Sequence, residues 1–355
     1  MAGNTAATGS GAGAGGRTGP ETPADTGAET GTETPADTGA GGTEAVARWI
    51  RRHAHPLTTM DPGAPAADLQ PLAAMVGNAR TVALGASVRD SHELSSTAHR
   101  ILRLLVEQEG FRALALEGDD AARVGLDAYI RTGAGDPRAL LAGARSFWRT
   151  GELLAVVRWM RSHNERNPDD PVRFAGVPSD GGGARPPYSG PAGVEWSLAE
   201  NTRRWHERTG DRIVHWGGLA HTANGDARTV SPAPSPTAHR NAGGRLRRLW
   251  GPEYVSLGLT FHHGRTSQPV PDPPEEFAES VLGGAGLDAY LLDLRAPAPA
   301  PVREWLAAPA RTRLVGPWYD PGEDAAHHMS GGALADWFDI VVHVREVTPA
   351  RPLTG

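Results

Sequence analysis

The sequence contains no cysteine and no lysine, so that all 35 of its basic residues are arginines. Without cysteine there are no disulfides, no thiolate metal sites and no cysteine nucleophile. Without lysine there is neither a Schiff-base mechanism nor a P-loop for nucleotides. A genome biased toward arginine codons is the simplest cause of this composition. The net charge of −6 argues against a general nucleic-acid binder, because the chain as a whole has no excess positive charge to neutralise the phosphates.

Long apolar segments are absent too, since no run approaches the roughly 20 residues that span a membrane. The first 43 residues are almost entirely Gly, Ala, Thr, Pro, Asp and Glu, and the octapeptide at 21–28 is repeated at 33–40. With no large apolar side chain to offset the entropy of ordering, residues 1–43 are predicted to be a disordered tail. The tail has neither the basic start nor the apolar core of a targeting peptide. We expect a soluble, cytoplasmic protein with no nucleic-acid or membrane partner and leave its oligomeric state open.

Short apolar runs alternate with amphipathic helical patterns over residues 44–355, which predicts a single α/β domain. The predicted strands cover residues 81–85, 113–117, 171–177, 212–218, 255–261, 289–294, 313–316 and 340–344. The predicted helices cover residues 44–53, 92–109, 119–131, 138–144, 151–164 and 195–208. Such a chain forms a mostly parallel central sheet flanked by helices, with helical additions, and ligands bind at the carboxyl edge of the strands.

Polar residues follow these strands. They are Ser87, Arg89, Asp90, His92 and Glu93 after the first strand, Glu117 after the second, His221 after the fourth, His262 and His263 after the fifth, and Asp293 and Arg295 at the sixth. We expect them to converge on one edge of the sheet, and this convergence is the main reason to predict an enzyme.

Glu117 ends an otherwise apolar strand, where partial desolvation would raise the pKa of its carboxyl group and suit it to general acid or base catalysis. The alternative is a carboxylate that caps the following helix, and position alone favours neither.

Arg89 lies at the mouth of the sheet, where an obligate cation can hold a carboxylate or phosphate. Ser87 is the best-placed hydroxyl beside it. His92 and Glu93 belong to the same turn. The alternative for this group is a helix cap, at Asp90 or Ser91, followed by a solvated charged face.

Gly217 and Gly218 allow a ligand to approach the backbone closely and expose amide donors. His221 then becomes a candidate base or proton donor at neutral pH, although a histidine near a tight turn is often structural.

Two pairs of adjacent histidines, at 262–263 and 327–328, raise the question of a metal site. Neighbouring side chains in an extended segment point to opposite faces, so such a pair seldom chelates one ion. No H-E-x-x-H motif is present. We therefore expect neither a metal nor another cofactor.

Residues 84–93 and 110–117 resemble the opening of the erythromycin esterase family. Further matching blocks lie at 147–152, 159–164, 172–176, 199–201, 216–221, 338–342 and 350–353, so the resemblance covers nearly everything after about residue 45. The resemblance implies an α/β core with helical additions and hydrolysis of a macrolide lactone. It also implies a water molecule activated by His and Glu side chains, without a required metal.

The sequence departs from this family at four positions. The usual first motif, Gly-Glu-Ala-Thr-His-Gly, places its Glu on Ala86 and its His on Arg89. The usual fourth-strand motif, Trp-Ala-His-Asn-Ala-His, places its first His on Gly218, and the acidic residue after the third strand falls on Pro178. An arginine cannot serve as a general base. The family residues that are retained are Glu93, Glu117, Arg149 and His221.

These observations assign candidate roles to nine residues. The catalytic candidates are Glu117, His221 and Glu93. The substrate-binding candidates are Arg89, His92, Arg149, Ser87, Gly217 and Gly218. We predict a divergent hydrolase or related tailoring enzyme that acts on an ester or lactone in a natural product or modified peptide.

Two alternatives remain. One is a non-catalytic relative that binds a ligand or partner in the former active-site cleft, and the other is a carrier or scaffold role in which the acidic, disordered tail matters most. An Arg89–Glu117 ion pair that fills the cleft would favour a binding protein. A single cavity surrounded by Glu117, Arg89 and His221 would favour an enzyme.

Overall fold

The computed structural model describes residues 38–118, 120–176, 190–225, 228–232 and 240–353. Most of the predicted tail and Pro178 lie outside these ranges. Helix α1 (Thr38–His53) begins six residues before the predicted start at 44, and the compact unit spans Gly39–Gly355. Within the described ranges no helix is long and apolar enough to cross a membrane.

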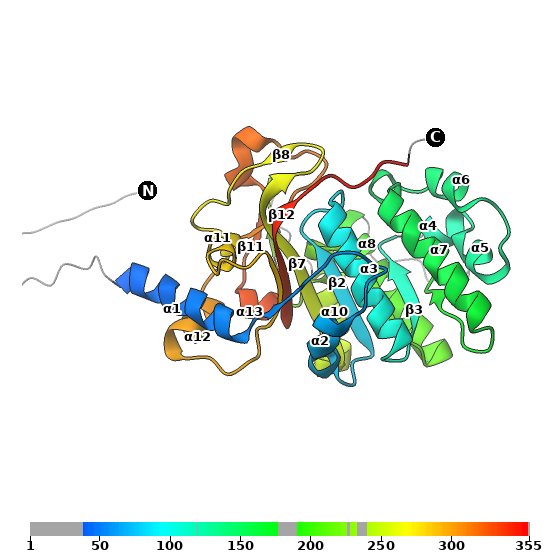
Figure 1. Cartoon of the computed structure of the whole chain (residues 1–355), viewed down its shortest axis with the longest axis horizontal. Helices are drawn as coiled ribbons and strands as arrows, with labels where there is room; N and C mark the ends of the chain where they lie inside the picture. The colour runs from blue at the N-terminus through cyan, green and yellow to red at the C-terminus, as the bar shows by residue number, and fades with distance from the viewer. Residues whose placement is uncertain (1–37, 119, 177–189, 226–227, 233–239, 354–355) are drawn as a thin grey trace, which may run out of the picture. The chain divides into compact units, whose positions relative to one another are not determined.

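A nine-stranded sheet forms the centre of this unit, with the order β1-β9-β12-β7-β2-β5-β3-β4 and β8 paired to β7. The strands are β1 (His55–Pro56), β2 (Thr81–Ala86), β3 (Phe111–Leu116), β4 (Arg173–Phe174), β5 (Arg212–Gly218), β7 (Tyr254–Arg265), β8 (Pro269–Val270), β9 (Ala289–Asp293) and β12 (Ile340–Val347). All neighbours from β12 to β4 are parallel, which confirms the predicted mostly parallel sheet (Figure 1).

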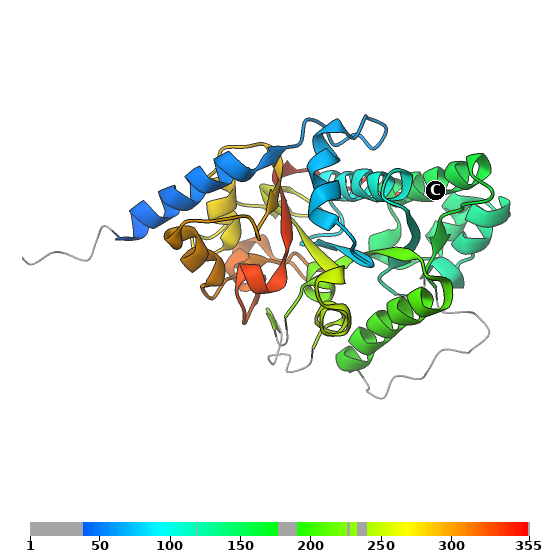
Figure 2. The same cartoon turned by 90° about the horizontal axis from the view of Figure 1, so that it is seen from below.

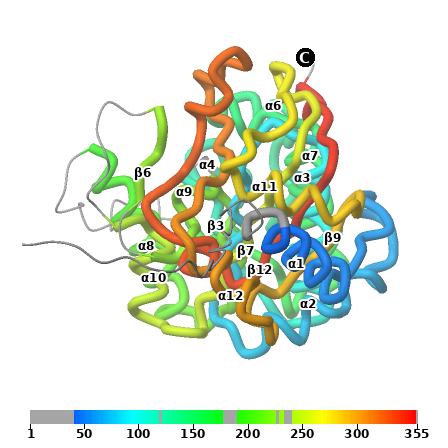
Figure 3. Tube along the Cα trace, turned by 90° about the vertical axis from the view of Figure 1, so that its left-hand side faces the viewer, coloured from blue at the N-terminus to red at the C-terminus, as the bar shows by residue number. Residues whose placement is uncertain are grey.

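Helices cover both faces of the sheet, as its apolar strands require. One face carries α2 (Gln70–Val76), α3 (His92–Glu107) and α7 (Gly151–Arg166), and the other carries α8 (Gly190–Thr209), α9 (Leu219–Thr222) and α10 (Ala242–Trp250). Figures 2 and 3 show α3 and α7 on one side of the strands and α8 and α10 on the other. Val82 and Leu84 of β2 pack in the first layer, and Ala83 between them packs in the second. This alternation follows from the two-residue period of a strand.

Further helices complete the domain. α11 (Ala278–Gly283), α12 (Ala300–Ala307) and α13 (Leu334–Trp337) pack with α1 against β9 and β12 in a separate apolar cluster. The single helix predicted over 119–131 is instead two helices, α4 (Asp120–Arg123) and α5 (Leu126–Thr132), followed by α6 (Pro137–Ala142). Gly125 separates α4 from α5 because its φ of 84° is left-handed and cannot continue an α-helix.

Two strand predictions need correction. The segment predicted at 313–316 is not in the central sheet. It forms β10 (Thr312–Arg313) in a small antiparallel sheet with β11 (His328–Ser330) and β6 (Thr229–Val230). β9 is in the central sheet but runs antiparallel to β12. The carboxyl end of β9 therefore lies at the opposite edge from the carboxyl ends of the parallel strands.

Candidate active site

A cavity of about 540 Å³ lies where β2 and β5 end. Its apolar lining includes Val88, Phe147, Ala220, Val230, Leu314 and Val315. Its polar lining includes Ser87, Arg89, Asp90, Glu195, His221 and Arg228. A concave apolar surface with a few convergent polar groups is the usual form of a small-molecule site.

His221 is oriented by a carboxylate from another element. It lies in the short helix α9 directly after β5, and its Nδ1 is 2.9 Å from Oε1 of Glu195 in α8. Glu195 in turn accepts from Arg228 Nη2 at 2.5 Å and from the backbone amide of Ala242 at 2.9 Å. A carboxylate that accepts from Nδ1–H fixes the tautomer of the imidazole and leaves Nε2 for chemistry.

Glu117 lies behind the residues that line the cavity and contacts two of them, Arg89 and His221. Its Oε2 is 2.8 Å from Nη2 of Arg89 and accepts from the amide of Gly218 at 2.8 Å. Its Oε1 is 3.5 Å from Nε2 of His221. The Glu117 side chain is only 8% exposed, while that of Arg89 is 25% exposed. Glu117 therefore positions Arg89 and His221, and these two residues line the cavity.

The charges of this cluster follow from its contacts. Burial alone would raise the pKa of Glu117, but His221, Arg89 and the Gly218 amide outweigh burial and lower it. The pKa of Glu195 is lowered in the same way, against burial, mainly by His221 and Arg228. Burial disfavours the imidazolium of His221, yet its hydrogen bond to Glu195 and the charge of Glu117 raise its pKa above 6.5. The predicted rise in the pKa of Glu117 is therefore wrong, because that prediction considered burial alone and not the charges of Arg89 and His221.

Arg89 fills the space beside Gly218. A Cβ atom at Gly218 would lie 2.3 Å from Arg89 Nη2, closer than any real contact. The guanidinium also lies over the ring of Phe147, 4.3 Å from its centroid, a cation–π contact. Two departures from the family motif, Arg89 and Gly218, are thus neighbours in space, and the lack of a side chain at Gly218 makes room for Arg89.

Ser87 and Gly217 also lie near this centre. Ser87 lines the cavity, but the residue is only 1% exposed and its hydroxyl has no hydrogen-bond partner among the described residues. At Gly217 a Cβ atom would lie 3.2 Å from the Glu117 side chain, so this glycine allows Glu117 to pack closely. The amide of Gly218 was expected to face a ligand, but it donates to Glu117 instead.

Besides Glu117 and Gly217, three predicted site residues, Glu93, His92 and Arg149, do not line the cavity. Glu93 accepts from the amide and the hydroxyl of Thr348, both at 2.6 Å. His92 Nδ1 is 2.7 Å from Glu152, which also accepts a hydrogen bond from Nε of Arg351. These contacts tie the start of α3 to the C-terminal segment. They agree with the structural alternative for this turn, in which Ser91 caps α3 by accepting from the Leu94 amide.

Arg149 is exposed and donates from Nε to the Ala144 carbonyl at 2.6 Å. Asp293 and Arg295, expected at the same edge, pair with each other at 2.8 Å, and Arg295 also donates to the Met75 carbonyl. The antiparallel direction of β9 carries these two residues away from the cavity.

The sequence prediction missed Glu195 and Arg228. Glu195 follows a Gly/Pro-rich stretch and begins the helix predicted over 195–208, where an acidic residue has an ordinary explanation in the helix dipole. The structure instead begins α8 at Gly190 and places Glu195 in its second turn. The burial of this carboxylate in α8 appears only in the structure, so no sequence signal marked Glu195. Arg228 precedes a two-residue strand in the small sheet, for which no periodic pattern exists.

Comparison with known proteins identifies the class. A family model described as erythromycin esterase matches residues 106–180 and 194–347, so the chain belongs to this family. Erythromycin esterase type II from Escherichia coli is 26% identical over 140 residues. The match covers 39% of this chain and 33% of that protein, so it spans about a third of the relative's length. Membership of this family supports a hydrolase-like function.

Solved structures share the fold. A Bacillus cereus protein has a TM-score of 0.70 with 21% identity, covering 87% of this chain and 99% of its own. A structure described as a succinoglycan biosynthesis protein has a TM-score of 0.72 with 20% identity, covering 87% and 98%. A mutant of the erythromycin esterase EreC in its open conformation has a TM-score of 0.59 with 12% identity, covering 83% and 98%. The predicted erythromycin-esterase-like α/β fold is thereby confirmed.

Proposed function

We propose that this protein hydrolyses an ester or lactone bond in a natural product or modified peptide, by acid–base chemistry that needs no metal. The observation that carries the proposal is the Glu195–His221 pair on the cavity wall, with Nδ1 of His221 fixed 2.9 Å from Glu195. A histidine held by a buried carboxylate is the arrangement that moves protons in many acyl-transfer enzymes.

In the proposed reaction, neutral His221 takes a proton from water through Nε2 while the water oxygen bonds to the acyl carbon. Glu195 stabilises the imidazolium that forms, and the exposed part of the Arg89 guanidinium faces the negative carbonyl oxygen. The alkoxy C–O bond then breaks, and the imidazolium returns the proton to the leaving oxygen. The products are a carboxylic acid and an alcohol. Because the pKa of His221 is raised above 6.5, the rate should increase as the pH passes upward through that pKa.

The surroundings of His221 support chemistry without a metal at this point. Both carboxylates near the imidazole are already paired with guanidinium groups, Glu117 with Arg89 and Glu195 with Arg228. A divalent cation placed between the two carboxylates would be repelled by these two guanidinium charges.

The apolar lining supports a substrate with a bulky hydrocarbon part. A macrolide lactone is the first compound to test, followed by simpler esters and acylated peptides. Purified protein is incubated with each compound, with and without a chelator, and the products are analysed by mass spectrometry. Addition of one water molecule, unaffected by the chelator, is the expected result. Loss of the reaction with chelator would contradict the metal-independent mechanism.

One observation favours a different function. Arg89 stands where the family usually has a histidine, and an arginine cannot take up a proton. Its ion pair with Glu117 instead places a fixed cation in the cavity. A non-catalytic relative that binds a carboxylate-bearing ligand there would show saturable binding and recovery of the ligand intact.

A further inference from the structure

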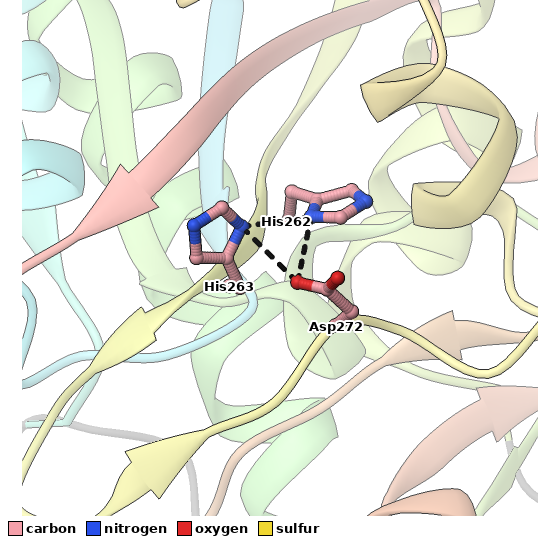
Figure 4. Close-up of side chains that lie close together, drawn as sticks. All are labelled: His262, His263 and Asp272. Atoms are coloured by element: carbon pink, nitrogen blue, oxygen red, sulfur yellow. Dashed lines mark hydrogen bonds and ion pairs between the residues drawn. The ribbon is translucent and has the colours of Figure 1, made fainter.

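A second cluster of side chains lies outside the cavity, where β7 ends and the chain returns through β8. It consists of His262, His263 and Asp272, and their side chains converge (Figure 4). The two Nδ1 atoms are 2.9 Å apart. Asp272 Oδ1 lies 3.6 Å from Nδ1 of His262 and 3.5 Å from Nδ1 of His263. The expectation that adjacent histidines would point apart is therefore wrong, because side-chain rotation brings both Nδ1 atoms toward Asp272.

The two distances to Asp272 match a metal site better than a hydrogen-bonded cluster, while the 2.9 Å between the two Nδ1 atoms is within hydrogen-bond range. A separation of 3.5–3.6 Å is too long for a good hydrogen bond from imidazole to carboxylate. The two nitrogen–oxygen separations are slightly longer than the spacing of tetrahedral ligands, and the nitrogen–nitrogen separation of 2.9 Å is shorter than that spacing. Ligands at about 2.0–2.1 Å from a tetrahedral ion are about 3.3–3.4 Å apart, whereas adjacent ligands of an octahedral ion are about 3.0 Å apart.

The chemistry of the three ligands also favours a borderline transition metal. Two imidazole nitrogens and one carboxylate oxygen suit Zn²⁺ and leave a fourth coordination position for solvent. His262 is 20% exposed and is held in place, since its ring packs where a Cβ atom of Gly283 would lie.

We propose that His262 Nδ1, His263 Nδ1 and Asp272 Oδ1 form a tetrahedral Zn²⁺ site that clamps the β7–β8 hairpin. The site ties the end of β7 to the residue two positions beyond β8, and β8 pairs with β7 through Gly264 and Val270. The turn between the strands contains Ser267, which lines the cavity and donates its amide to Asp90 at 3.0 Å. Bound zinc would therefore fix one part of the cavity wall without taking part in hydrolysis.

The test is metal binding by the full chain without a polyhistidine tag. Chelator-treated protein is titrated with Zn²⁺ by calorimetry and with Co²⁺ by visible absorption. We expect one equivalent of each to bind and the intense Co²⁺ bands of tetrahedral coordination. Asp272→Asn is a mild test variant because the Asp272 side chain is 80% exposed, and it should weaken binding at least about tenfold. His263→Gln should do the same.

Glu275→Gln is the matched control, since it removes an exposed carboxylate three residues away, and it should leave the affinity unchanged. Failure of the full chain to bind either metal would overturn the proposal. Binding that survives both Asp272→Asn and His263→Gln would also overturn it. Binding that is lost in His221→Asn instead would place the metal in the cavity and contradict both this site and the metal-independent mechanism.

Discussion

The guanidinium of Arg89 occupies the space that a side chain at residue 218 would need. A Cβ atom at Gly218 would lie 2.3 Å from Arg89 Nη2, while the same nitrogen is 2.8 Å from Glu117. Arg89 cannot easily move aside, because it is held by the carboxylate and lies over Phe147. The shape and charge of this part of the cavity therefore depend on the two residues together.

Gly218→Ala should lower the free energy of unfolding by about 1–3 kcal/mol, because the new methyl group displaces Arg89 from Glu117. In an Arg89→Ala background the same change should cost much less, since the space is then empty. Chemical denaturation of the four proteins of this double-mutant cycle measures the difference. Equal costs of Gly218→Ala in both backgrounds would show that the two positions do not interact.

Glu117→Gln should impair both stability and activity. The substitution keeps the shape of the side chain but removes the charge that holds Arg89 and His221, and we expect a loss of about 2–3 kcal/mol. It should also lower the pKa of His221, because the Glu117 carboxylate is one of the groups that raise it. The pH–rate profile should then shift to lower pH, a change that a purely structural role would not produce. An unchanged profile would contradict the positioning role.

Three histidines make the fold sensitive to acid. Burial lowers the pKa of His99 and of His343 to about 3, and that of His215 to about 4. The unfolded chain takes up these protons below about pH 6.5, while the folded chain does not, so stability falls as the pH drops from 6.5 toward 4. His215→Leu should remove a penalty on the order of 2 kcal/mol at pH 5.

Thermal unfolding of wild type and His215→Leu at pH 7.5 and pH 5 measures this effect. His215 is fully buried in β5, whereas His55 is only partly buried, so His55→Leu is the control. The variant should lose less stability than wild type on acidification, and the control should behave as wild type does. An equal loss in all three proteins would refute the assignment of His215.

Glu93→Gln should affect stability and leave catalysis intact. Glu93 accepts two hydrogen bonds from Thr348 and does not line the cavity, so its loss should cost about 1 kcal/mol through detachment of the C-terminal segment. Hydrolysis rates measured well below the unfolding temperature should match those of wild type. A large fall in kcat with unchanged stability would show that Glu93 takes part in catalysis.

The periodic parts of the fold could be predicted from sequence, and the non-periodic parts could not. The strands β2, β3, β5, β7 and β12 appear in the sequence as short, nearly continuous apolar runs, and the long helices α3 and α7 appear as apolar residues at helical spacing. Strand direction does not appear in such a pattern, so the antiparallel β9 was misjudged, and Asp293 and Arg295 were expected at the wrong edge. Two-residue strands such as β6 and β10 leave no pattern at all.

The candidate site was predictable only where it follows a strand. Arg89, Glu117 and His221 each come just after a buried apolar run, and the structure brings them together. Glu195 reaches the same place from within a helix, so only the three-dimensional packing of α8 against β5 reveals it. Glu93 and His92 follow the same strand as Arg89 but turn toward the C-terminal segment, a distinction that sequence position does not contain.

The central claim is that His221, held by Glu195, moves the proton in hydrolysis of an ester or lactone. The most direct measurement compares wild type with His221→Asn on one compound that both proteins bind, following water addition by mass spectrometry and binding by calorimetry. The account predicts that His221→Asn still binds the compound but hydrolyses it at least about 100-fold more slowly. If wild type and His221→Asn bind the compound equally and both return it intact, the cavity serves binding and the proposed chemistry is wrong.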